Sequence, residues 1–266
     1  RTGDHLEKKS KYKPRQRLWY IRAKEVLLST GSIERPIVFG NNDTPGVFLS
    51  AAAKEYIKVY GVLVGKKPLI FTNNDSAYET AIEFKKNGVE PIVLDTREDQ
   101  NSELINEAKD LKIDIRFSHA VEAANGYKKV KSATIGKLNG DKTDFVSTEI
   151  IDCDCICVSG FWTPTVHLAS QSGNKLKFND EIDAFVPDKS KQNENSIGSS
   201  NGTFTLKETL ENSFKMGAEV SNKITNKNEQ IQLPNTNERK FSSHDKFWCS
   251  PLSKGKNYKR FVDFQN

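Results

Sequence analysis

The sequence predicts an α/β protein of the nucleotide-binding kind, and two stretches carry this prediction. In the first, an apolar strand (Val26–Leu28) ends in the small turn Ser29-Thr30-Gly31, and a loop rich in proline and glycine leads to a helical pattern near Val47. The second, residues 68–95, reads as strand, tight turn, helix, strand and acidic residue. Both orders are typical of α/β proteins that bring backbone against a nucleotide.

Hydrophobic periodicity and turn residues predict the other elements. Helices are expected over residues 48–60, 76–86, 102–111 and 205–216, and strands over residues 22–28, 68–71, 91–94, 114–117, 129–138, 145–151, 153–158 and 184–187. The first helix is expected to place Phe48, Ala51, Ala52, Tyr56 and Val59 on one stripe. The turn Asn139-Gly140-Asp141 predicts a hairpin between two of the strands.

Composition excludes some classes of function. The net charge of +5 is scattered except for a basic cluster in the first two dozen residues, which we interpret as a solvated terminus and not as a nucleic-acid footprint. No apolar run approaches the roughly 20 residues that cross a bilayer, and no signal peptide is visible. We therefore expect a soluble, cytoplasmic protein without nucleic-acid or membrane partners. Because the chain starts at Arg1 and not at methionine, we expect it to be a piece of a longer protein.

Cys153, Cys155 and Cys157 alternate within an apolar run, which places them on one face of a predicted strand. Zinc and iron–sulfur sites usually use two thiolates on a CxxC turn, a geometry that a straight strand does not offer. We interpret the three residues as buried free thiols and predict no metal site.

Residues 68–95 have the layout of a dinucleotide-binding unit but lack its glycines. Where the pattern G-x-G-x-x-G/A is expected, the chain has Thr72, Asn74 and Ala77, and Asp95 lies near the place of a ribose-binding acid. Side chains at the first two positions occupy the volume that phosphates need. We interpret this unit as a Rossmann-like scaffold that no longer binds; a nucleotide site built from side chains is the alternative.

Four segments, in this order, resemble the alpha subunit of heterotetrameric sarcosine oxidase: STGSIERPIVFGNNDTPGV, FTNNDSAYETA, VSGFWTPTVHLASQSGNKL and FVDFQN. The resemblance implies a Rossmann-like dinucleotide-binding domain interrupted by a second one, as in two-domain FAD/NAD(P)-binding flavoproteins. The outer domain would contain residues 1–46 and 148–223, the inserted domain residues 47–147, and residues 224–266 would lead toward a C-terminal folate-binding domain that this chain lacks.

The resemblance also implies a function. The family's alpha subunit binds NAD in the outer domain, while FAD and FMN belong with the beta subunit in a complex of alpha, beta, gamma and delta subunits. That complex is an oxidoreductase acting on CH–NH donors. It demethylates sarcosine to glycine, reduces oxygen to hydrogen peroxide and transfers the one-carbon unit to tetrahydrofolate. The fragment would not be catalytic alone. The alternatives are a non-binding scaffold for subunit assembly, or a subunit of another flavin-dependent amine or opine dehydrogenase or of hydrogen cyanide synthase.

The candidate cofactor-binding residues follow from the same motifs. Thr30 and Gly31 match the family's small residues beside the dinucleotide, with a plain strand-ending turn as the alternative. The segment with Ser199, Ser200, Gly202 and Phe204 precedes a helix, so its backbone N–H groups suit an anion; a simple N-terminal cap is the alternative.

No catalytic residue is predicted. His167 lacks a recognisable acid or nucleophile nearby, and a structural histidine is the preferred interpretation. Family members often have glycine where this chain has Phe161, so this loop is expected to pack differently. The last twenty residues include Phe247, Trp248, Phe261, Val262 and Phe264, too many apolar side chains for a free tail. We expect them to dock on this domain or on another one.

Overall fold

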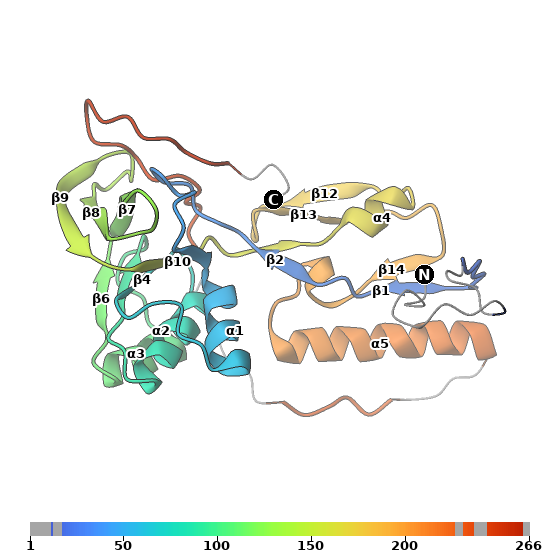
Figure 1. Ribbon diagram of the computed structural model, residues 1–266. Helices are drawn as coiled ribbons and strands as arrows, with labels where there is room; N and C mark the ends of the chain where they lie inside the picture. The colour runs from blue at the N-terminus through green and yellow to red at the C-terminus, as the bar shows by residue number, and fades with distance from the viewer. Residues whose placement is uncertain (1–11, 13–17, 227–230, 237–243, 263–266) are drawn as a thin grey trace.

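The computed structural model of the chain describes residues 12, 18–226, 231–236 and 244–262. Two units lie side by side in Figure 1. The inner unit contains residues 47–159, and the outer unit contains residues 26–34 and 162–225. The predicted docking of Phe264 and most of the basic N-terminal cluster fall outside the described residues.

The inner unit is built on a five-stranded parallel sheet with the order β3-β10-β4-β5-β6. Its strands are β3 (Val47–Leu49), β4 (Pro68–Thr72), β5 (Ile92–Asp95), β6 (Asp114–Phe117) and β10 (Cys155–Ser159). Helices cover one face: α1 (Ser50–Tyr60), α2 (Ser76–Lys86) and α3 (Glu103–Asp110). An antiparallel meander covers the other: β7 (His119–Asn125), β8 (Ser132–Leu138) and β9 (Phe145–Asp152). This arrangement is Rossmann-like, as predicted.

Both faces of the central strands are buried, and this explains their continuously apolar sequences. Along β4, Leu69 and Phe71 join the core beneath the meander, whereas Ile70 joins the core beneath the helices. The carboxyl ends of all five strands meet at one edge of the sheet, where parallel α/β folds bind their ligands.

The alternating cysteines are free and buried, as predicted. Cys155 and Cys157 pack on the helix side of β10, but Cys153 packs beneath the meander. The expectation of one shared face is wrong for Cys153 because it precedes the strand, so the strand's alternation does not include it. Within the described residues, no group of three or more His, Cys, Asp or Glu side chains is placed to hold a metal ion.

Helix α1 buries a different face from the predicted one. Its buried residues are Ser50, Ala53 and Ile57, whereas Tyr56 and Val59 are exposed. The small residues allow a close approach to α2, where the Ser50 hydroxyl donates to Oγ1 of Thr80 at 2.8 Å. Packing between helices therefore decides the orientation of α1: Ile57 is buried, whereas Tyr56, Val59 and Tyr60 remain exposed.

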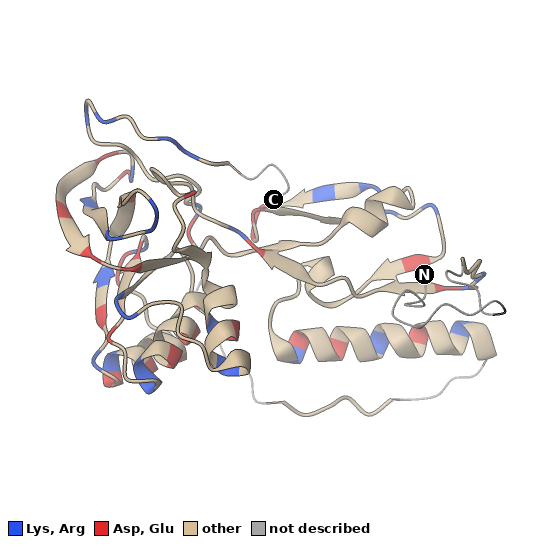
Figure 2. Cartoon of the chain, in the orientation of Figure 1, with Lys and Arg blue, Asp and Glu red and all other residues tan. Residues whose placement is uncertain are grey.

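The outer unit contains short strand pairs and one long helix (Figure 1). Strand β1 (Val26–Leu28) pairs in parallel with β14 (Glu194–Ser196), and β2 (Ser32–Glu34) pairs antiparallel with β11 (Trp162–Pro164). Strands β12 (Leu176–Asn179) and β13 (Ala184–Pro187) form a hairpin. Helix α4 (His167–Gln171) and the 3-10 helix η2 (Gly198–Asn201) join these strands, and α5 (Leu206–Thr225) follows. Acidic and basic residues are interspersed along α5 (Figure 2), so this helix does not present charge of one sign.

Strand pairing bears on the expected domain boundary at residue 148. That residue lies inside β9, and the next strand, β10, hydrogen-bonds to β3 and β4 of the inner sheet. We therefore propose that the chain returns to the outer unit after Ser159. Helix α5 also extends to Thr225, beyond the expected end at Met216, because Gly217 is accommodated within an exposed helix.

The C-terminal residues dock on this chain. Residues 244–250, which we call the strap, run beside residue 38, where the Val38 N–H donates to the Trp248 carbonyl at 2.9 Å. Phe247 is buried in the inner core, and its ring meets the ring of Phe71 edge-on at 6.4 Å. This segment is thus part of the folded protein and supplies side chains to both units. In the described part of the chain, no helix is long and apolar enough to cross a membrane.

Candidate functional site

A cavity of about 510 Å³, which we call the inter-unit cavity, lies between the two units. Seven segments of the chain meet there: the start of β2, α1, the start of α2, the start of β11, the β12–β13 turn, the turn from η2 into α5, and the strap. Its lining comprises Ser32, Lys54, Asn74, Asp75, Ser76, Glu79, Phe161, Trp162, Glu181, Ile182, Ser199, Gly202, Phe204, Thr205, Glu208 and His244.

Three of the six candidate cofactor-binding residues, Ser199, Gly202 and Phe204, line the inter-unit cavity. Gly31 does not line the cavity, but the next residue, Ser32, does. The φ of Gly31 is +77°, and a Cβ atom added to Gly31 would meet no protein atom within 4 Å. The backbone at Gly31 is therefore both restricted to glycine-like conformations and open on the side where a side chain would project.

The two remaining candidates turn their hydroxyl groups toward the protein. The Thr30 hydroxyl donates to the Thr165 carbonyl at 2.7 Å. Ser200 is buried, and its hydroxyl lies 2.8 Å from the carbonyl oxygen of Ile197 and 3.2 Å from that of Leu28. The Ser200 contact joins β1 to the η2 turn, and the Thr30 contact joins the end of β1 to the residue after β11, so Thr30 and Ser200 shape the backbone next to the cavity without lining it.

Two helices begin at the inter-unit cavity. At the start of α5, the Thr205 hydroxyl oxygen accepts the Glu208 N–H, and this hydroxyl also donates to the Glu208 carboxylate. At the start of α2, Asn74 Oδ1 accepts the Ser76 N–H at 3.0 Å. The first-turn N–H groups and dipoles of both helices favour negative charge. Lys54 adds a positive charge, which pairs with Glu79 at 2.7 Å.

Aromatic rings form one wall of the cavity. The rings of Phe161 and His244 are stacked, with centroids 4.2 Å apart and planes 4° apart. Phe204 meets Phe161 edge-on at 5.1 Å. Nearby, the Trp162 indole N–H donates to the Ser76 hydroxyl at 3.2 Å, which links the outer unit to α2.

Sequence reasoning did not find this wall. His244 lies 83 residues from Phe161 in the chain, and no local pattern marks either residue as one of a pair. Two signals were available. Family members often have glycine where this chain has Phe161, and glycine is typical of a positive φ such as the +79° of Phe161. The C-terminal segment also has an unusual density of aromatic residues.

The degenerate nucleotide turn of the inner unit is filled by its own side chains. The Thr72 hydroxyl donates to the Asn74 carbonyl, and the Asn74 amide donates to Ser159. Asp95 is fully buried and accepts hydrogen bonds from the Tyr78 hydroxyl and the Arg97 guanidinium. Burial raises the pKa of Tyr78, and the Asp95 charge raises it further. A ribose-binding role for Asp95 is therefore blocked by these partners.

The strap closes the same edge of the inner sheet. The Asp245 N–H donates to the Asn73 carbonyl at 2.9 Å, and the Asn73 amide donates back to the Asp245 carbonyl at 2.7 Å. The Asp245 carboxylate accepts from the Thr96 hydroxyl at 3.0 Å and pairs with Lys142. A carboxylate of the protein thus lies where the carboxyl ends of β4 and β5 would otherwise face a ligand.

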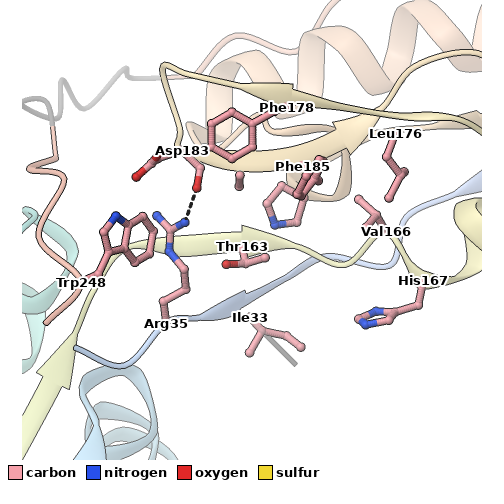
Figure 3. A pocket seen from close by; sticks show the side chains of 12 residues that line it. Ile33, Arg35, Thr163, Val166, His167, Leu176, Phe178, Asp183, Phe185 and Trp248 are labelled. Carbon is pink, nitrogen blue, oxygen red and sulfur yellow. Dashed lines mark hydrogen bonds between the residues drawn. The ribbon is translucent and has the colours of Figure 1, made fainter. Parts of the chain in front are cut away.

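A second cavity of about 310 Å³ lies on the other side of β2 and β11 (Figure 3). Its walls are mainly apolar, and Phe178 and Phe185 of the β12–β13 hairpin cover it. His167 lines this cavity and not the first one, and it is not assigned a chemical role.

Arg35 borders the second cavity and is buried. Its guanidinium donates to the carbonyls of Gly160, Ile182 and Asp183, and it lies 4.1 Å from the centre of the Trp248 ring (Figure 3). Burial lowers the pKa of Arg35 to about 10, and the Asp183 charge opposes that shift. The side chain joins β2, the hairpin and the strap at one point.

Comparison with known proteins shows which proteins the chain is similar to. No protein-family model matches the sequence. It is 34% identical over 204 residues to sarcosine oxidase subunit alpha of Corynebacterium sp. (strain P-1), a match covering 77% of this chain and 21% of that protein. It is 32% identical over 193 residues to the corresponding subunit of Rhizobium meliloti (strain 1021), covering 70% and 18%. Over this stretch the chain is homologous to a fragment of the sarcosine oxidase alpha subunit. It spans about a fifth of the length of these curated relatives.

Solved structures similar to this relative of the sarcosine oxidase alpha subunit have the fold class that its sequence predicts. L-proline dehydrogenase from P. horikoshii has a TM-score of 0.55 at 22% identity, covering 78% of this chain and 36% of that one. T. acidophilum thioredoxin reductase has a TM-score of 0.54 at 16% identity, covering 68% and 59%. At such identities the likeness concerns the fold alone. The predicted Rossmann-like α/β fold of the flavoprotein type is confirmed.

Proposed function

We propose that this chain is the NAD-binding part of a sarcosine oxidase alpha subunit, with its site at the inter-unit cavity. The observation that carries the proposal is the meeting of Ser199, Gly202 and Phe204 with two helix N-termini around one cavity. Sequence motifs alone predict these three residues as cofactor-binding residues. Thr30, Gly31 and Ser200 would support the site from the adjoining backbone.

The residues fit a dinucleotide in three respects. The N–H groups of Gly202 and Thr203 donate to the carbonyls of Ser199 and Gly198, but the first N–H groups of α5 lie at a helix N-terminus and suit a phosphate. The open side of Gly31 leaves room for a group that a side chain would exclude. The aromatic wall suits a flat ring. Bound NAD would supply a nicotinamide ring, and the residues of this chain would hold and orient the dinucleotide.

The activity of the whole enzyme is part of the same proposal. In it, the chain belongs to a complex with beta, gamma and delta subunits that carries FAD and FMN, oxidises sarcosine with oxygen and transfers its one-carbon unit to tetrahydrofolate in the cytoplasm. The 34% identity to a sarcosine oxidase subunit alpha supports this assignment. The contribution of the present chain is cofactor binding and assembly, since the cavity offers no nucleophile paired with a base among the described residues.

Calorimetric titration of the protein with NAD tests the proposal. Gly31→Val is expected to abolish binding, because in the proposed site it places a side chain in the open space that the bound dinucleotide would take. Gly61→Val is the matched control: Gly61 also has a positive φ (+64°) and open surroundings, but it ends α1 away from the cavity. If both variants bind NAD as the unsubstituted protein does, or if the unsubstituted protein binds none, the proposal is wrong.

A scaffold that only assembles subunits is the second candidate. The observation that favours it is the filled nucleotide turn of the inner unit, where Asp95 and Asn74 are satisfied by protein groups. In that case the inter-unit cavity would be an interface without a cofactor. Assembly with the partner subunits that is unaffected by Gly31→Val, together with absence of NAD from gently purified complex, would favour the scaffold.

A further inference from the structure

The aromatic wall of the inter-unit cavity contains a strained residue. Phe161 has a φ of +79°, a conformation that bulky side chains rarely adopt. Hydrogen bonds to β2 hold it there: the Arg35 N–H donates to the Phe161 carbonyl at 2.8 Å, and the Gly160 N–H donates to the Arg35 carbonyl. Strained backbone that its surroundings enforce is concentrated at binding sites. In this chain the enforced conformation places the Phe161 ring in the cavity wall.

The stacking partner of Phe161 comes from the strap. His244 packs face to face on Phe161, and its Nε2 atom is buried with no hydrogen-bond partner among the described residues. The next residue, Asp245, anchors the strap to the inner unit through Asn73, Thr96 and Lys142. The wall therefore depends on strap docking, because His244 can stack on the face of the Phe161 ring only when the strap is anchored to the inner unit.

This wall also adjoins residues of the proposed NAD site. Phe204 meets Phe161 edge-on, and Phe204, His244 and Phe161 all line the same cavity as Ser199 and Gly202. Flat rings pack well against such walls, through stacked and edge-on contacts. A ligand held at the η2–α5 turn would thus place a flat ring within reach of the wall and, through it, of the strap.

We propose that His244 is a positioning residue of the dinucleotide site: stacked on Phe161, it holds the wall on which a flat ring of the dinucleotide packs. Dinucleotide binding and strap docking then stabilise each other, because each favours the same ordered arrangement of His244 and Phe161. The inference rests on the proposed function, and it assigns a binding role to the C-terminal segment. The dinucleotide has two flat rings that could pack on this wall, adenine and nicotinamide.

Two measurements test the proposal. Calorimetry gives the NAD affinity of the unsubstituted protein and of the variants His244→Ala and His244→Phe, with His119→Ala as a histidine control away from the cavity. His244→Ala is expected to weaken binding roughly tenfold, the size of one ring contact of about 1.4 kcal/mol. His244→Phe keeps a stacking ring and is expected to restore affinity to within about twofold. Titration with AMP and with nicotinamide mononucleotide shows which ring loses affinity in His244→Ala.

The second measurement needs no variant. Hydrogen exchange of residues 244–250 is expected to slow severalfold when NAD is added to the unsubstituted protein, whereas a strap of purely structural role would not respond. Unchanged exchange, or equal NAD affinity in His244→Ala and the unsubstituted protein, overturns the inference while leaving the proposed function intact. If the unsubstituted protein binds no NAD, the proposed function fails and this inference fails with it.

Discussion

The carboxylate of Glu34 accepts a hydrogen bond from the backbone N–H of Ala51, with an N–O distance of 2.7 Å. Glu34 belongs to β2 of the outer unit, and Ala51 lies in the first turn of α1 in the inner unit. The N-cap residue of α1 is Leu49, whose side chain makes no capping bond. A buried acid from one unit therefore caps a helix of the other. This relationship couples the contact between the units to the ionisation of one side chain.

Stability is expected to depend on pH through Glu34. Burial raises the pKa of its carboxyl group from 4.5 to about 7, against the opposing effects of the Ala51 hydrogen bond, Ser159 and the Lys54 charge. Between these two pKa values the folded protein retains a proton that the unfolded chain releases. The free energy of unfolding should thus be highest below pH 4.5 as far as Glu34 contributes, and fall as pH rises toward 7, by about 1–3 kcal/mol.

Glu34→Gln isolates this effect, because glutamine keeps an acceptor for the Ala51 N–H but does not ionise. Urea unfolding at pH 5 and pH 8 should show similar stability at pH 5 and a more stable variant at pH 8. A difference between variant and unsubstituted protein that is the same at both pH values would contradict the assignment of this pH dependence to Glu34.

Arg35→Lys is expected to destabilise the protein by about 2–4 kcal/mol. The guanidinium satisfies three backbone carbonyls in a fixed planar geometry, and an ammonium group has no equivalent fork. Arg116→Lys is the control: Arg116 pairs at the surface with Asp114 and Glu149, where a change of below about 1 kcal/mol is expected. Equal losses in the two variants on urea unfolding would show that the buried contacts of Arg35 are not special.

Asp245→Ala is expected to loosen the strap. It removes the acceptor of the Thr96 hydroxyl and the partner of Lys142, both of which are partly buried, at a loss of about 1–2 kcal/mol. Amide exchange of residues 244–250 should accelerate while the core strands β4 and β5 remain protected. Asp43→Ala, which removes an exposed ion pair with Lys259 in the same C-terminal region, should leave the strap unchanged. Strap exchange that is alike in both variants would argue against the Asp245 anchor.

Tyr78→Phe tests whether the inner nucleotide turn is a closed structural network. The Tyr78 hydroxyl is buried and donates to Asp95 at 2.8 Å, so its removal should lower stability by about 1–2 kcal/mol. Tyr56→Phe, at an exposed position of α1, should change stability by less than about 0.5 kcal/mol. Tyr78→Phe should bind no additional nucleotide, because the Arg97 guanidinium still donates hydrogen bonds to Asp95. Calorimetry that shows a second molar equivalent of nucleotide bound to Tyr78→Phe would refute the closed network.

Elements whose signals are local can be predicted from the amino-acid sequence. Helix α2 begins and ends at Ser76 and Lys86 as predicted, β6 occupies residues 114–117, and the Asn139-Gly140-Asp141 turn joins β8 to β9. Caps, apolar runs and turn residues act within a few positions, so they can be read from the chain. The family assignment is also a property of the sequence, because it rests on motifs of adjacent residues.

Which face each element buries, and which partners it contacts, depends on how the elements pack in three dimensions. The amino-acid sequence does not show that α1 buries Ala53 and exposes Tyr56, because the buried face of α1 depends on the shape of α2. Nor does it show that His244 stacks on Phe161 or that Asp245 occupies the edge of the inner sheet. These contacts join residues far apart in sequence, and their energies arise from burial and geometry that exist only in the folded chain. The candidate site lies where such contacts converge, so the sequence indicated three of its lining residues and the fold supplied its wall.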